Sequence, residues 1–584
     1  VHRDGDAGVI RYRERAHFFR GLGLFVEASA AGRVFSITET PQFTMNGPMI
    51  DVSQGNAVPT VATVTGLLRS MALMGLNMLM LYAEDSYDVP EQPYFGSMRG
   101  RYSHDEMRAI DDDADALGIE LIPCIQTLSH LKDVLKWDAF AAIRDDDETM
   151  LVGSEATYAF VEQMIVAASA PVRTKRIHIG MDEAWHLGLG NYLAENGYRS
   201  KFEIMNAHLR RVMEIVRRHG LEPMIWSDMY FRAGSRTGDY YDVESHIPRA
   251  VMDEVPDDVQ LVYWDYYHGD EAFYAEWIRR HKAFGSTPIF AGGIWNWNQI
   301  ALNYGWTFTA TNAALAACKR EGVREVIATV WGDDGTECDL HAAMLGLQLF
   351  AEHGFAAELD EGKLARRFRF CTGGEMADFR AIGLLDEPPG VPAGNPEQAN
   401  PSRYLLWQHP LLGLFDANTR GRELGAHYAR LAEEMAACAA RNGVYGPVFA
   451  FYARLCDVLA VKAEVGLRIT DAYRGGDRDT LRAIGATELP EVVARVRALR
   501  ACHRERWHAL YAPFGWEVID TRYGGLLMSL DTAMHRIGEY VAGRIERIAE
   551  LEEPRLPYQG REGLMRVPYA GRMASASRLV WYEG

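Results

Sequence analysis

Cysteine is scarce in this sequence and follows no pairing pattern. The 584 residues contain 7 Cys, an odd number without close-spaced pairs. This distribution argues against a disulfide framework and favours buried free thiols in a reducing compartment. The sequence has neither a CxxC pair nor an HExxH segment, which argues against a structural or catalytic zinc site. We therefore expect a protein that needs no metal and no cofactor.

Long apolar runs and an excess of positive charge are also lacking. No uninterrupted apolar run reaches the roughly 18 residues of a membrane span, and the first residues show no signal peptide. The formal net charge of -19 argues against nucleic acid and anionic membranes as partners. We expect a cytoplasmic protein with a neutral substrate such as a sugar.

Regular alternation of apolar runs and helical segments begins near residue 46. The length allows two or three domains, and a hydrophobic content of 48% allows a sizeable core. Eight apolar runs occur, at 47–53, 79–85, 120–126, 176–183, 222–228, 259–267, 288–295 and 325–334. Helical patterns between them, such as 61–75 and 200–220, predict an α/β fold with a closed (β/α)8 TIM barrel. The alternative is a doubly wound open sheet, but the first run lacks the Gly-rich phosphate turn of such folds.

The remaining segments predict two flanking regions. Residues 1–40 predict a helix and a strand from a small α/β domain, followed by a barrel over 41–355. Residues 356–584 predict a mainly helical C-terminal domain, with helices near 421–441, 447–474, 488–511 and 526–552. The Pro/Gly-rich stretch 386–401 predicts a long loop. The segment PFGWEVIDTRYGG at 513–525 predicts a loop or hairpin, from which Arg522 and Tyr523 could shape a pocket.

Carboxylates and tryptophans gather at the predicted carboxyl ends of the strands. Chemistry in TIM barrels lies at these ends, which carry Asp51, Glu84, Asp85, His130, Asp182, Glu183, Trp226, Asp228, Trp264, Tyr266, Trp295, Trp297, Trp331 and Asp333. For a single Trp, core packing is the alternative, but five at one rim favour sugar binding, because aromatic faces stack on sugar rings.

The adjacent pair Asp182 and Glu183 is the strongest candidate for catalysis. Two carboxylates together suit general acid and base work. A solvated pair that caps the following helix is the alternative. The strand-end position, with Gly180 before the pair and His178 on the same strand, favours catalysis. A lone His130 is more often structural, but beside a carboxylate pair it would orient the acid.

The segment HIGMDEA at 178–184 resembles the H-x-G-G/M-D-E signature of glycoside hydrolase family 20, the β-N-acetylhexosaminidases. The segments 41–59 and 82–106 are similar to the family's first two barrel strands, and TVWGDDGTE at 329–337 is similar to its eighth. The tail, with segments at 400–416 and 513–526, resembles the bacterial subgroup that has a helical C-terminal domain. This subgroup resemblance suggests a homodimer.

The resemblance implies a retaining exo-hydrolase that removes terminal β-GlcNAc, with β-GalNAc left open, from oligosaccharides or glycoconjugates. In this family the substrate's acetamide oxygen is the nucleophile. Glu183 would be the general acid and Asp182 would orient the acetamide. Trp226, Trp264 and Trp331 would wall its pocket, Glu84 and His130 would form the network behind the acid, and Asp333 would bind hydroxyls. Trp295 and Trp297 are further candidates for sugar binding.

Two departures from the family pattern affect specificity. Asn46 stands where the family has an arginine that grips sugar hydroxyls, which leaves hydroxyl recognition open. The seventh strand carries Trp295 and Trp297 without the family's Tyr-x-Asp, so Tyr266 or Tyr267 would donate to the acetamide oxygen. A chitinase-like endo-glycosidase and a catalytically inactive sugar-binding protein remain the alternatives.

Overall fold

The computed structural model describes residues 1–32 and 34–577. These residues form two compact units that alternate along the chain. The first comprises Val1–Gly293, Thr309–Trp331 and Leu347–Cys371, and the second comprises Ile294–Phe308, Gly332–Gly346 and Thr372–Gly584. The short segments that follow the last two barrel strands in sequence therefore belong to the second unit.

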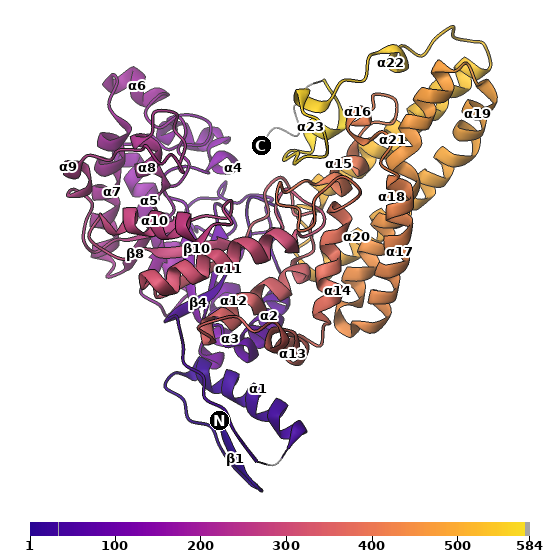
Figure 1. Cartoon of the computed structure of the whole chain (residues 1–584). Coiled ribbons are helices and arrows are strands. Elements are labelled where there is room, and N and C mark those ends of the chain that lie inside the picture. Colours follow the sequence, from indigo (N-terminus) through magenta and orange to yellow (C-terminus); the bar gives the residue numbers. More distant parts are fainter. Residues whose placement is uncertain (33, 578–584) are drawn as a thin grey trace. The chain divides into compact units, whose positions relative to one another are not determined.

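Within the described residues, eight parallel strands close into a barrel in the first unit (Figure 1). In chain order they are β4 (Met45–Asp51), β5 (Met78–Ala83), β6 (Glu120–Ile125), β7 (Arg176–His178), β8 (Glu222–Trp226), β9 (Gln260–Trp264), β10 (Ile289–Gly293) and β11 (Glu325–Val330). Strand β11 pairs with β4 and closes the ring. The predicted (β/α)8 barrel is confirmed, because an open sheet would leave two unpaired edges.

The barrel strands are apolar because both of their faces are covered. Every residue of β4 and of β5 is buried. A parallel strand in a barrel turns one face to the packed interior and the other to the surrounding helices. Double burial therefore explains why these strands appear in the sequence as nearly continuous apolar runs.

Helices follow the barrel strands along the chain, and local signals fix their ends. In chain order they are α2 (Val61–Met74), α3 (His104–Leu117), α4 (Lys132–Leu135), α5 (Glu155–Ser169), α6 (Asn191–Asn196), α7 (Lys201–Arg218), α8 (Asp228–Gly234), α9 (Arg249–Met252), α10 (Glu271–Lys282), α11 (Tyr304–Glu321), α12 (Met344–Phe355) and α13 (Glu361–Thr372). Ser200 and Glu203 form a capping box at the start of α7. Just beyond its end, Gly220 has a φ of 63°, close to the predicted terminus.

The first forty residues form a three-stranded antiparallel sheet and one helix. The elements are β1 (His2–Asp4), β2 (Ala7–Val9), α1 (Arg15–Ala31) and β3 (Val34–Ser36), with strand order β2-β1-β3. The sequence predicts only one of these strands, since each has three residues and shows no period. Arg20 of α1 is buried and bonds Glu39, and its Nη1 lies 3.0 Å from Glu352 Oε1, which ties α1 to the barrel unit.

The second unit is helical, as the sequence predicts. Its helices are α14 (Met376–Ala381), α15 (Pro401–Trp407), α16 (Asp416–Thr419), α17 (Leu424–Arg441), α18 (Gly446–Arg474), α19 (Arg478–Ala483), α20 (Leu489–Leu510), α21 (Trp516–Val541), α22 (Ala549–Glu552) and α23 (Gly571–Ala574). Figure 1 shows α17, α18, α20 and α21 as long neighbouring helices. Residues 387–400 carry no helix or strand, which agrees with the predicted loop.

The predicted loop or hairpin at 513–525 is wrong. Gly515 has a φ of 87°, and helix α21 begins directly after it. Glycines 524 and 525 disfavour a helix, but a buried stripe at helical spacing outweighs their cost. That stripe consists of Trp516, Ile519, Arg522, Tyr523, Leu526 and Leu530. Arg522 and Tyr523 are therefore buried on a helix, and Arg522 Nη1 donates to Glu337 Oε1 at 2.8 Å.

One helical segment, Gly443–Arg474, is long and apolar enough to cross a membrane by length and composition alone. Its most apolar window has a mean hydropathy of 1.4, and 56% of that window is buried inside the protein. The segment contains Arg454, Asp457 and Lys462, which explains why the sequence shows no uninterrupted apolar run there. A core helix of a helical domain passes the same test, and α17 packs along it.

All seven cysteines lie among the described residues as free thiols. Six are buried, and Cys502 is half-buried. Burial raises the pKa of the Cys318 and Cys456 thiols, so these groups stay protonated and act as small apolar side chains. The prediction of buried free thiols is confirmed for these six.

Candidate active site

The turn after β7 brings two adjacent carboxylates to one imidazole. Gly180, Met181 and Glu183 have φ angles of 71°, 77° and 46°. This left-handed backbone breaks the alternation of a regular strand, in which neighbouring side chains point to opposite faces. As a result, His130 Nε2 lies 3.2 Å from Asp182 Oδ2 and 3.6 Å from Glu183 Oε2.

Asp182 lies in a polar, buried environment that favours its charged form. Gln126 Nε2 donates to Asp182 Oδ1 at 2.6 Å and to Tyr82 Oη at 2.9 Å. Burial alone would raise the pKa of Asp182, but the charge and hydrogen bond of His130 and the bond from Gln126 lower it below its usual value. Asp182 is therefore a carboxylate at neutral pH.

Glu183 lies in a different environment, although it is the next residue. Arg232 Nη2 donates to Glu183 Oε1 at 2.9 Å, while the Glu183 backbone N–H donates to Asp228 Oδ2 at 3.1 Å. Burial raises the pKa of the Glu183 carboxyl to about 7; Asp228 and Asp182 also raise it, and His130 and Arg232 oppose the rise. At neutral pH Glu183 therefore exchanges a proton readily, as a general acid requires.

Glu84 and His130 lie beside this pair. His130 Nδ1 is 4.0 Å from Glu84 Oε1, to which Tyr82 also donates at 3.1 Å. Burial raises the pKa of Glu84 to about 8. Burial would lower the pKa of His130, but Asp182, Glu183 and Glu84 raise it well above its usual value. Three of the predicted residues, Glu84, Asp182 and Glu183, thus come together around the imidazolium ion of the fourth, His130.

Aromatic side chains lie next to the carboxylates. Trp226, Trp264, Tyr266 and Trp331 are all buried in the first unit. The ring centroid of Trp331 is 4.9 Å from that of Tyr82 and 6.3 Å from that of Trp226. Trp264 stacks on Tyr266 at 5.5 Å, and the Arg232 guanidinium is 5.8 Å from the Trp264 ring. Tyr82 therefore links Trp331 and Trp226 to Glu84, and Arg232 links Trp264 and Tyr266 to Glu183.

Trp295, Trp297 and Asp333 belong to the second unit. The rings of Trp295 and Trp297 stack with centroids 4.3 Å apart, and the Arg566 guanidinium lies 4.9 Å from the Trp295 ring. Asn298 Nδ2 approaches Asp333 Oδ2 at 3.5 Å. Their role in sugar binding stays a prediction.

The comparison of Asn46 with the family's sugar-binding arginine is wrong. Asn46 is the second residue of β4, at the amino end of the barrel, and its Nδ2 donates to the Phe350 carbonyl at 2.8 Å. The carboxyl end of that strand is Asp51, whose Oδ1 accepts from the backbone N–H groups of Ser53 and Gln54. Sequence similarity located the strand but misplaced the residue by almost its full length.

Sequence reasoning missed three side chains that bond the central pair: Gln126, Arg232 and, as a partner of Glu183, Asp228. Gln126 directly follows β6 at the carboxyl end, which was a usable signal. Asp228 and Arg232 are spaced i,i+4 on α8, and Arg232 Nε donates to Asp228 Oδ2 at 2.8 Å. That spacing also was visible, but it is common on exposed helices and did not indicate a site.

Among residues 1–32 and 34–577, no group of three or more His, Cys, Asp or Glu side chains could hold a metal ion. The central carboxylates instead bond an imidazole, a guanidinium and an amide. The arrangement suits proton transfer by Glu183 beside a fixed negative charge on Asp182.

Two family models match this chain. The glycosyl hydrolase family 20 catalytic domain matches residues 43–273, and the glycoside hydrolase 20C C-terminal domain matches residues 377–567. The chain belongs to glycoside hydrolase family 20. Its catalytic-domain match includes Asp182 and Glu183.

Two curated relatives match part of this chain. Human hexosaminidase D is 29% identical over 196 residues, which are 31% of this chain and 39% of the human protein. Bovine hexosaminidase D is 26% identical over 235 residues, which are 37% of this chain and 62% of the bovine protein. The match spans less than two thirds of either relative.

Solved structures with a similar fold include two family 20 enzymes. The exo-β-N-acetylglucosaminidase from Vibrio harveyi, in complex with N-acetylglucosamine, is 15% identical with a TM-score of 0.44, and the match covers 59% of each chain. The β-N-acetylhexosaminidase from Streptomyces coelicolor is 17% identical with a TM-score of 0.44, covering 61% of this chain and 78% of that one.

Proposed function

We propose that this protein is a retaining exo-β-N-acetylhexosaminidase that hydrolyses terminal β-GlcNAc by substrate-assisted catalysis, with β-GalNAc left open. The observation that carries the proposal is the unequal environment of two adjacent carboxyls. Asp182 is kept ionised by His130 and Gln126, whereas burial raises the pKa of Glu183 to about 7. Titratable pairs whose environments separate their pKa values commonly divide the acid and base roles of an active site.

The proposed first step transfers one proton and breaks the glycosidic bond. The acetamide oxygen of the substrate attacks the anomeric carbon as the bond to the leaving oxygen breaks, and Glu183 protonates that oxygen. Asp182 accepts a hydrogen bond from the acetamide N–H and stabilises the positive oxazolinium-like ring by its charge. An intramolecular nucleophile reacts at a high effective concentration, which removes the need for a nucleophilic carboxylate from the protein.

The proposed second step restores the enzyme. A water molecule gives a proton to the Glu183 carboxylate and attacks the anomeric carbon, and the oxazolinium ring opens to regenerate the acetamide. Two inversions at one carbon retain the β configuration. The buried rings of Trp226, Trp264 and Trp331 support this substrate class, because aromatic walls can enclose the acetamide methyl group.

The test compares chromogenic β-glycosides that differ only at the 2-position. A β-GlcNAc substrate should be hydrolysed, and the matching β-glucoside should be almost inert because it has no carbonyl oxygen near the anomeric carbon. Proton NMR at early times should show the β anomer as first product. Comparable rates on the two glycosides, or an early α product, would refute the mechanism. Release of internal fragments from a longer oligosaccharide would instead indicate an endo-enzyme.

A further inference from the structure

Trp185 differs from the other tryptophans near the carboxylates because it is exposed. Its exposed fraction is 46%, whereas Trp226, Trp264 and Trp331 are 1%, 8% and 9% exposed. A single exposed apolar side chain is ordinary on a protein surface, so it is the contacts of the Trp185 ring that distinguish this residue. Trp185 follows the carboxylate pair in the chain by two residues, and its N–H donates to the Glu183 carbonyl at 2.7 Å.

Arg232 connects the Trp185 ring to the acid. Its guanidinium lies 4.1 Å from the Trp185 ring centroid, and its Nη2 donates to Glu183 Oε1 at 2.9 Å. The Arg232 side chain is only 10% exposed, so the cation lies beneath the indole. The cation–π contact orients the ring, and Lys201 Nζ holds the backbone of Trp185 by donating to its carbonyl at 2.5 Å. A single side chain, that of Arg232, therefore separates the Trp185 ring from the proposed proton donor Glu183.

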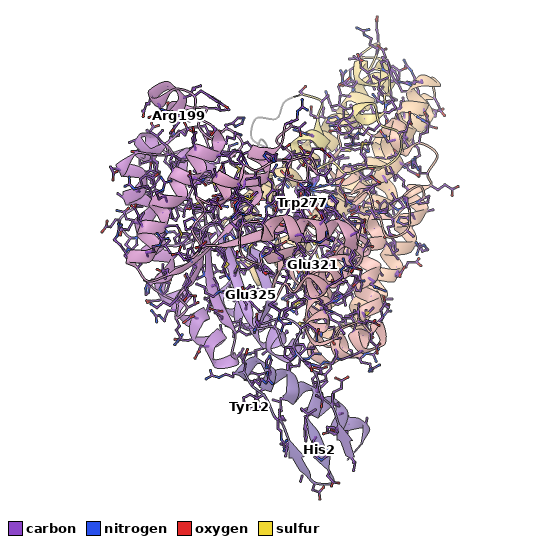
Figure 2. All side chains as sticks on the ribbon, turned by 60° about the vertical axis from the view of Figure 1, so that its left-hand side comes forward. His2, Tyr12, Arg199, Trp277, Glu321 and Glu325 are labelled. Carbon is purple, nitrogen blue, oxygen red and sulfur yellow. The ribbon has the colours of Figure 1, made fainter. Side chains whose placement is uncertain are left out.

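The segment that carries Trp185 lies toward the carboxyl ends of the barrel strands. Figure 1 places α6 (Asn191–Asn196) at the end of the first unit opposite the N-terminal sheet, and Figure 2 shows Arg199 there, away from His2. Glu325, the first residue of β11, lies between these two ends in Figure 2. Trp185 follows His178, the last residue of β7, by seven positions, so it lies in the loop at the carboxyl end of that strand, where TIM barrels carry their active sites.

We infer that Trp185 is the stacking platform for the leaving-group sugar of the substrate. The inference rests on the proposed function. Glu183 donates its proton to the oxygen that joins the two sugars, so the leaving group must extend from the Glu183 carboxyl. The buried tryptophans surround the sugar that is transferred, and Trp185 offers its exposed indole to the next ring. A pyranose presents C–H bonds on one face, which pack on an aromatic ring.

The consequence is a preference for substrates in which β-GlcNAc is joined to another sugar. Loss of the indole should weaken binding of a disaccharide much more than binding of a glycoside with a small leaving group. An aromatic contact of this kind is worth about a tenfold change in affinity. Because the contact persists from ground state to transition state, its loss should raise KM more than it lowers kcat.

The experiment measures kcat and KM on a β-linked GlcNAc disaccharide and on methyl β-GlcNAc. Both have poor alkoxide leaving groups, so acid catalysis is matched between them. In Trp185→Ala and Trp185→Leu, kcat/KM on the disaccharide should fall about tenfold further than on the methyl glycoside. The leucine variant keeps apolar packing over Arg232, and Trp185→Phe should restore most of the loss. Tyr198→Ala, which removes a ring that is 76% exposed in the same segment, serves as the control and should match the wild type.

The outcomes separate this inference from the proposed function. Equal losses on both substrates, with a displaced pH profile, would show that Trp185 only supports Arg232 and would overturn the inference. No loss on either substrate would overturn it as well. A wild-type protein inactive on both glycosides would refute the proposed function, and the inference would fall with it.

Discussion

Replacing Arg232 by Gln is expected to raise the pH at which activity declines. Activity requires protonated Glu183, so it is full below the Glu183 pKa of about 7 and is lost as the pH rises through it. The positive charge of Arg232, with Nη2 2.9 Å from Glu183 Oε1, favours the ionised form and lowers that pKa. An opposite charge at this range lowers a carboxyl pKa by about 1 to 3 pH units, so its removal should move the alkaline limb upward by that order.

A second variant, at Asp228, should shift the pKa of Glu183 in the opposite direction, because Asp228 contacts both Glu183 and Arg232. Asp228 raises the pKa of Glu183 by repulsion, and its Oδ2 accepts from both the Glu183 N–H and Arg232 Nε. Asp228→Asn removes the charge, keeps the shape of the side chain and leaves Arg232 free to act on Glu183. The alkaline limb should therefore move to lower pH in Asp228→Asn.

The assay is kcat/KM as a function of pH on a chromogenic β-GlcNAc substrate, because kcat/KM reports the groups of the free enzyme. Circular dichroism and thermal unfolding of both variants serve as folding controls. If the alkaline limb stays in place in Arg232→Gln, or if the two variants move it in the same direction, Glu183 is not the titrating acid and the electrostatic argument is wrong.

Three other predictions concern the two carboxylates of the site and one buried ion pair of the second unit. Glu183→Gln should reduce turnover of a β-GlcNAc disaccharide by about 10²- to 10⁴-fold, and near wild-type kinetics would remove Glu183 from the acid role. Asp182→Asn should lower kcat while the fold persists; an unfolded spectrum would instead assign Asp182 a structural role. Arg403→Ala should destabilise the second unit by roughly 3 to 5 kcal/mol in urea unfolding, because it leaves the fully buried Glu337 with one guanidinium partner fewer. A change below about 1 kcal/mol would contradict that estimate of the buried ion pair.

Local patterns in the sequence determined the barrel and the position of the catalytic pair. A strand buried on both faces must be apolar along its length, and an amphipathic helix must repeat its apolar residues every three or four positions. Both signals are contained in short segments, so the eight strands and helix α7 could be predicted within a few residues. The ends of the strands then placed Asp182, Glu183, Trp226 and Trp264 on one rim.

Similarity to known sequences added roles but not exact positions. Glu84 and His130, taken from the family pattern, do lie beside the pair, with His130 Nδ1 4.0 Å from Glu84 Oε1. Asn46 does not occupy the position assigned to it, because an apolar strand matches almost equally well when the alignment is shifted along it. The first ten residues of helix α21, 516–525, were missed because two glycines outweigh a buried stripe in any local reading, whereas its second half falls in the helix predicted near 526–552.

Tertiary structure alone decided which charges act on each carboxyl. Gln126 lies 56 positions before Asp182, and Arg232 lies 49 positions after Glu183, yet each bonds its partner directly. The left-handed φ of Glu183 aims two neighbouring side chains at one imidazole, which no strand pattern predicts. Composition and spacing identify which groups can ionise, but a pKa depends on burial and on charges within a few ångströms, and those distances exist only after the chain has folded.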